Sequence, residues 1–193
     1  MITETLPSPT AAAVLTAVVP GRLVFHRDEP SRFGPIEVLS HDGVVKGRSM
    51  KQQQEFPFDA ADLLTAAQLA EVLIDLAGQA SIPASADQVG AYARTLAEAY
   101  GAHSQAGDLA VGDFAFYRED PDAYGPLSIQ AVASKVTAYS KYKELELDFD
   151  QADLSTAVQL AEELISALTI EDAELRQLKV SACAKALAAA FAS

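Results

Sequence analysis

The sequence predicts an α+β fold in which one unit is written twice. Shifting the 193-residue chain by 91 positions aligns residues 21–100 with residues 112–191 without a gap, and 28 of the 80 paired positions are identical. Chance in an Ala-rich chain would give roughly 10%. In each copy, stretches that alternate apolar and polar residues precede stretches with apolar residues every three or four positions. These periods are typical of strands and amphipathic helices. We therefore expect a tandem duplication of an antiparallel β-meander followed by a helical hairpin, βββ(β)αα twice.

The repeat also sets the expected domain organisation. The predicted segments are an N-terminal tail (1–20), repeat unit 1 (21–100), a connector (101–111) and repeat unit 2 (112–193). A lone unit of about 80 residues buries a small share of its surface and is marginally stable. We therefore expect the units to pack as one pseudo-two-fold body, like a homodimer joined end to end. Strand edges that meet at this axis would form one continuous sheet.

Strands are expected where apolar residues alternate. These positions are residues 23–26, 36–38, 44–48 and 52–58 in the first copy, and 114–116, 127–129, 135–139 and 145–149 in the second. Asp42-Gly43 is typical of a hairpin turn. Pro57 interrupts the last strand of the first copy, which favours an edge position for that strand.

Helix starts are expected at acidic caps. Asp59 and Asp150 are each preceded by Phe and followed four positions later by Leu, a pattern that predicts an N-cap with a hydrophobic staple. The second helix of each unit is expected from a capping box of Ser85 and Gln88, and from near Thr169 with Asp172.

Charge and cysteine content limit the function classes. The net charge is −13 and the pI is near 4.5, so nucleic-acid phosphates and anionic membrane surfaces should repel the chain. The apolar run at 11–19 is too short to span a bilayer. The single cysteine, Cys183, excludes an internal disulfide and a Cys-based metal cluster, and it fits a cytoplasmic location.

The best candidate surface is the loop between the first two strands of each copy. Both loops read Arg, two acids, Pro, two variable residues, then aromatic-Gly-Pro. Pro and Gly favour a rigid loop, and Arg and aromatic residues are enriched at binding hot spots. An Arg–carboxylate ion pair that only closes the loop is the structural alternative. The candidate partner-binding residues are Arg27, Asp28, Glu29, Phe33, Arg118, Glu119, Asp120 and Tyr124.

The sequence offers no catalytic set. It has neither a Walker loop nor a GxGxxG motif, and the three histidines suggest neither a metal site nor a general base for a nucleophile. We therefore predict no cofactor, no metal and no catalytic residue. An asymmetric site of His26 with Asp28 and Glu29 is the remaining catalytic alternative.

The favoured hypothesis is a non-enzymatic interaction or regulatory module that binds a protein partner through its duplicated loops. One alternative is a small-molecule binding protein or enzyme with a pocket at the junction of the repeats. Another is an acidic inhibitor that mimics nucleic-acid charge, of phage or bacterial origin.

Overall fold

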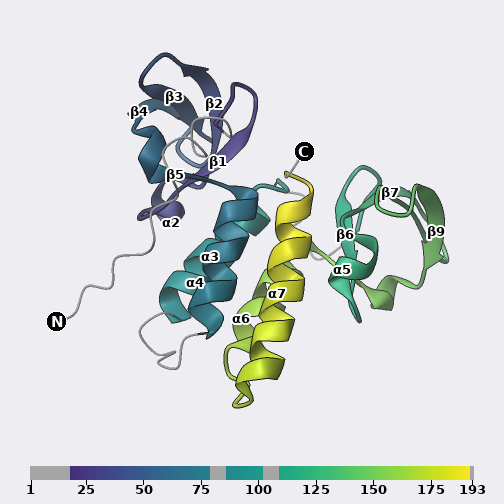
Figure 1. The fold of residues 1–193 in the computed structure, drawn as a ribbon. Coiled ribbons are helices and arrows are strands. Elements are labelled where there is room, and N and C mark those ends of the chain that lie inside the picture. Colours follow the sequence, from purple (N-terminus) through teal and green to yellow (C-terminus); the bar gives the residue numbers. More distant parts are fainter. Residues whose placement is uncertain (1–17, 79–85, 102–108, 192–193) are drawn as a thin grey trace.

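Two sheets stand on either side of a bundle of four helices (Figure 1). The computed structural model describes residues 18–78, 86–101 and 109–191. Each sheet has five strands and is antiparallel, and six α-helices fall within the described residues. This confirms the α+β class. Most of the predicted tail and connector, together with Ser85 and His103, lie outside the described residues.

The first half begins with its sheet and ends with two helices. Its elements are β1 (Leu23–His26), α2 (Pro30–Phe33), β2 (Pro35–His41), β3 (Val45–Ser49), β4 (Gln54–Phe58), the 3-10 turn η1 (Ala60–Asp62), β5 (Leu63–Thr65), α3 (Ala66–Gly78) and α4 (Ala86–Glu98). The strand order is β4-β3-β2-β1-β5. β4 is an edge strand, as its proline predicts, and Pro57 lies opposite Lys46.

The second half has the same order of elements. They are β6 (Phe114–Tyr117), α5 (Pro121–Tyr124), β7 (Leu127–Val132), β8 (Val136–Ser140), β9 (Leu145–Phe149), η4 (Gln151–Asp153), β10 (Leu154–Ser155), α6 (Ala157–Ala167) and α7 (Ala173–Ala189). The strand order, β10-β6-β7-β8-β9, is that of the first sheet read from its other edge. All eight strands predicted from alternation are present, with ends shifted by a few residues.

The predicted start of the first helix in each half is wrong. Asp59 and Asp150 precede the 3-10 turns, and an extra short strand separates each turn from its α-helix. The physical reason is that neighbouring leucines are buried in two different cores. An extended backbone allows this, because successive side chains of an extended segment point in opposite directions. Leu63 lies in the core of the first sheet, whereas Leu64 lies in the core between the helices. A helix starting after Asp59 would not place these neighbours in different cores.

Threonines that the acidic-cap interpretation overlooked cap α3 and α6, whereas Asp172 caps α7. The Thr156 side chain accepts a hydrogen bond from the Gln159 backbone N–H, and the Gln159 side chain accepts one from the Thr156 N–H. Thr65 and Gln68 form the same reciprocal pair before α3. The spacing Thr-x-x-Gln is a capping box, and it occurs at equivalent positions of both copies.

Replacing Thr156 by Ala should therefore lower the free energy of unfolding by about 1 kcal/mol. Asp150→Ala is the matched comparison, because the Asp150 side chain makes no cap hydrogen bond within the described residues. Its effect should stay within about 0.5 kcal/mol. Urea unfolding followed by circular dichroism measures both. A larger loss of stability for Asp150→Ala than for Thr156→Ala would show that Asp150, not Thr156, is the important cap.

The largest core lies where helices of both halves meet. α3 packs against α7, and α4 packs against α6. The expected apolar faces are buried there, including Leu73, Leu96, Leu164 and Leu187. Phe25 and Phe116 enter the same core from β1 and β6, and each sheet keeps a smaller core of its own.

The two sheets do not join. The hydrogen-bonded strand orders form two separate five-stranded sheets, so the expectation of one continuous sheet is wrong. Helices, not strand edges, occupy the space between the sheets (Figure 1). Small alanine side chains allow these helices to approach closely, and burial of their apolar faces holds the halves together.

Candidate functional site

The two predicted loops form one-turn helices, α2 and α5, which connect the first two strands of each sheet. Pro30 and Pro121 occupy the first turn of these helices, where a missing N–H costs little. Gly34 and Gly125 follow with φ of 63° and 62°, a conformation that favours glycine. The same backbone path therefore appears twice.

The aromatic residue of each loop faces inward. Phe33 is buried, and its ring centroid lies 5.0 Å from that of His26 and 5.2 Å from that of Phe58. Tyr124 is half-buried, with ring centroids 5.4 Å from Tyr117 and 5.6 Å from Phe149. Each ring thus anchors its loop to the sheet, and the Phe33 ring is not exposed for a partner.

One buried serine in each half binds the C-terminal end of the loop. The Ser49 hydroxyl donates to the carbonyl oxygen of Phe33, and the Ser140 hydroxyl donates to that of Tyr124 at 2.7 Å. The same serine oxygens accept backbone N–H groups of the turns after β3 and β8. Sequence reasoning missed these residues, although both serines are identical at equivalent positions of the two copies.

The arginines lie at the base of the loops. Arg27 is half-buried, and its Nε atom is buried without a hydrogen-bond partner within the described residues. Its carbonyl oxygen accepts a hydrogen bond from the buried Tyr92 hydroxyl of α4. The exposed Arg118 donates from a guanidinium nitrogen to the Leu154 carbonyl oxygen at 3.1 Å. These contacts tie both loops to neighbouring elements.

The acids form the exposed tips. Asp28, Glu29, Glu119 and Asp120 are all exposed. The ion pair of Glu29 is made with Arg32, at 2.9 Å, rather than with Arg27. The expected Arg27–carboxylate pair is therefore absent from the ion pairs of the described chain.

The His26 side chain accepts hydrogen bonds from the backbone of the loop. Its Nδ1 atom accepts the N–H groups of Asp28 and Glu29 at 3.3 and 3.2 Å. Tyr117 replaces it in the second half and donates to the Glu119 carboxylate at 3.0 Å, a bond that raises the pKa of Tyr117. The asymmetric catalytic alternative therefore lacks a histidine–carboxylate hydrogen bond in the described loop.

Cys183 is buried in the helical core. Burial raises the pKa of its thiol to about 12, so the thiol stays protonated at neutral pH. Protonation and burial both suppress its reactivity as a nucleophile.

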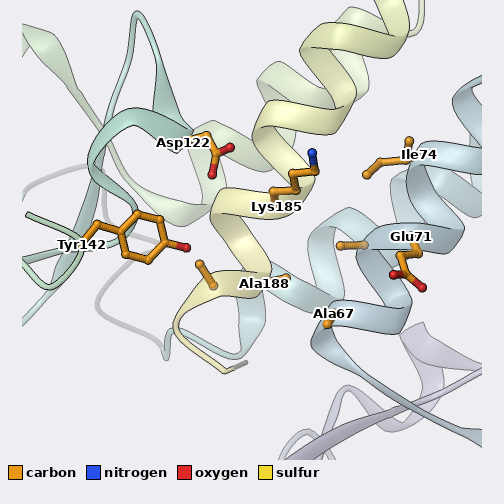
Figure 2. Close-up of a pocket in the computed structure, with 9 residues that line it drawn as sticks. Ala67, Glu71, Ile74, Asp122, Tyr142, Lys185 and Ala188 are labelled. Carbon is orange, nitrogen blue, oxygen red and sulfur yellow. The ribbon is translucent and has the colours of Figure 1, made fainter. Parts of the chain in front are cut away.

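A groove of about 320 Å³ lies at the junction of the two halves and is lined by residues of α3, α7 and α5 and by Tyr142 (Figure 2). The small-molecule alternative expects a pocket in this region. No group of three or more His, Cys, Asp or Glu side chains that could hold a metal ion occurs in the part of the chain that the structure describes.

Comparisons with known proteins give no family. No protein-family model matches the chain, and no curated protein matches it. In the described residues no helix is both long enough and apolar enough to cross a membrane.

Proposed function

We propose that this protein is a non-enzymatic interaction module of pseudo-dimeric architecture that binds a protein partner through its two duplicated loops. The observation that carries the proposal is that each half has a loop, α2 or α5, with the same backbone and an exposed charged tip. In each loop the proline, the glycine and the aromatic ring are fixed against the sheet, while two adjacent acids are exposed. A prearranged loop loses little conformational entropy on binding.

Helix contacts support the pseudo-dimer. Shifting the numbering by 91 turns α3 into α6 and α4 into α7. The contact of α3 with α7 then corresponds to the contact of α6 with α4, and both contacts are extensive. Such reciprocity is the pattern of a two-fold interface, in which each subunit uses the same surface. The loops α2 and α5 would be related by the same axis.

The charges of the tips indicate the chemistry of the partner. The second loop carries Glu119, Asp120 and Asp122 against Arg118 alone, whereas the first carries Asp28 and Glu29 beside Arg27 and Arg32, so the excess of acid lies in the second loop. A partner with basic groups complements this surface. Phe33 and Tyr124 are assigned as anchors of the loops, and the exposed acids as the contacting groups.

The test is retention of a partner from a lysate of the source organism on the immobilised chain. The loop variant is Asp28→Lys with Glu119→Lys, two equivalent exposed positions. Asp75→Lys with Glu171→Lys changes the net charge equally at exposed sites away from the loops. We expect a protein that the wild type and the control variant retain and the loop variant loses. It should elute as salt approaches about 1 M, where the screening length falls to about 3 Å.

Two results would contradict the proposal. A partner that all three proteins retain equally would place the interface elsewhere. If no protein is retained specifically by the wild type, the interaction function itself is wrong.

A further inference from the structure

The groove between the halves combines a small-residue floor with unpaired charges. Ala67 and Ala70 of α3 and Ala188 of α7 line it, and their short side chains leave the space open. Lys185 projects from α7 with Asp122 on one side and Ile74 on the other (Figure 2). Glu71 of α3 also lines the groove. Because no ion pair of the described residues includes Lys185 or Glu71, both charges remain available to a ligand.

The contact of α4 with α6 is equivalent to the contact of α3 with α7, and an ion pair bridges it. Glu71 and Lys185 correspond to Glu162 and Arg94, whose Oε1 and Nε atoms are 3.1 Å apart. This pair connects α4 to α6 across the contact that matches α3 with α7. An acid and a base at these positions can therefore form an ion pair between the two helices, as Glu162 and Arg94 do. Glu71 and Lys185 form no such pair among the ion pairs of the described residues.

A second difference between the two repeats also removes an ion pair at the groove. In the first half, Lys51 pairs with Glu98 at 3.7 Å and donates to the Ser31 carbonyl oxygen at 2.7 Å. The positions of Lys51 and Glu98 are occupied in the second half by Tyr142 and Ala189, which both line the groove. Thus neither the Arg94–Glu162 pair nor the Lys51–Glu98 pair has a counterpart at the groove among the ion pairs of the described residues.

Tyr142 forms a fixed wall with a polar tip. Its ring lies directly against Gly125, where an added Cβ atom would come within 2.9 Å of three ring carbons. Its hydroxyl end points toward α7 beside Ala188 (Figure 2). Burial and the neighbouring Asp122 raise the pKa of Tyr142, so the hydroxyl remains a hydrogen-bond donor at neutral pH.

We propose that this groove binds a small zwitterion of the free amino-acid class with an apolar side chain. The ligand's carboxylate would pair with Lys185, its ammonium group with Glu71 or Asp122, and its apolar part would lie on the alanine floor beside the Tyr142 ring. A volume of about 320 Å³ is at the lower end of the range for small-molecule sites, which suits a ligand of this size. The site depends on the unpaired Glu71 and Lys185, so the equivalent contact of α4 with α6, where Arg94 pairs with Glu162, should not bind the ligand.

The test is isothermal titration calorimetry of the intact chain with single amino acids, and with a simple carboxylate and a simple amine that carry the same apolar group. We expect one site per chain for at least one apolar amino acid, and binding at least tenfold weaker for the matching carboxylate and amine. Lys185→Gln and Glu71→Gln should each weaken amino-acid binding at least tenfold. Arg94→Gln and Glu162→Gln change the equivalent, paired residues between α4 and α6 and should leave the affinity unchanged.

Circular dichroism of each variant shows that a loss of binding is not a loss of fold, and all four positions are exposed. The proposal is overturned if no amino acid binds at millimolar concentration. Equal loss from the Arg94 and Lys185 variants, or equal affinity for the carboxylate and the amino acid, would also overturn it. Asp122 of the second loop lines the groove, but all four substituted positions lie outside the loops, so the interaction proposal is tested separately.

Discussion

Phe25→Ala and Phe116→Ala are each expected to lower the free energy of unfolding of the whole chain by about 3–5 kcal/mol. Both rings are fully buried, and both belong to the core formed by helices of the two halves. Phe116 also lies edge-on to Tyr100 of the first half, with ring centroids 5.4 Å apart. Removing either ring leaves a cavity that the surrounding helices fill only in part.

Urea unfolding followed by circular dichroism measures these losses. Val111→Ala is a suitable control, because Val111 is 66% exposed and should change stability by less than about 0.5 kcal/mol. A loss below about 1 kcal/mol for either phenylalanine variant would show that its ring does not belong to the common core.

Arg176→Met should lower the free energy of unfolding by about 2–4 kcal/mol, because it leaves a buried and a partly buried carbonyl oxygen without their charged donor. The Arg176 side chain is 5% exposed. Its Nε atom donates to the Ala77 carbonyl oxygen at 3.1 Å, and a terminal guanidinium nitrogen donates to the Ile170 carbonyl oxygen at 2.9 Å. The side chain therefore joins the C-terminal end of α3 to the turn between α6 and α7. Cations are stabilised at helix C-termini by the helix dipole.

Two further variants separate charge from geometry at this position. Arg176→Lys keeps the positive charge but lacks the planar fork, so we expect it to recover only part of the stability. Lys179→Met removes a positive charge from an exposed position of the same helix and should have little effect. Equal stabilities of the Met variant and the wild type, measured by urea unfolding, would contradict the assigned role.

Periodicity and the repeat were enough to predict the strands and the helical stripes. The edge position of β4 followed from Pro57 alone. The predicted start of the first helix in each half was wrong because Asp59 and Asp150 follow the acidic-cap pattern, whereas burial of Leu63 and Leu64 on opposite sides extends the backbone. The Thr-x-x-Gln signal was present in both copies and gives the correct starts.

The candidate site was predicted in outline only. The loops have the backbone that proline and glycine suggest, but the direction of Phe33 depends on its packing against His26 of β1 and Phe58 of β4. The role of Arg176 could not be read from its own segment, because its carbonyl partner at Ala77 lies 99 positions away. The open groove likewise depends on which residues the two helix contacts bring together.

The central claim is that the two halves form one body around a common helical core. Differential scanning calorimetry of the intact chain tests it most directly. The account predicts one transition whose calorimetric and van't Hoff enthalpies agree, which both Phe25→Ala and Phe116→Ala move to lower temperature. Two transitions, with Phe25→Ala lowering only one and Phe116→Ala only the other, would contradict it and show that the halves fold independently.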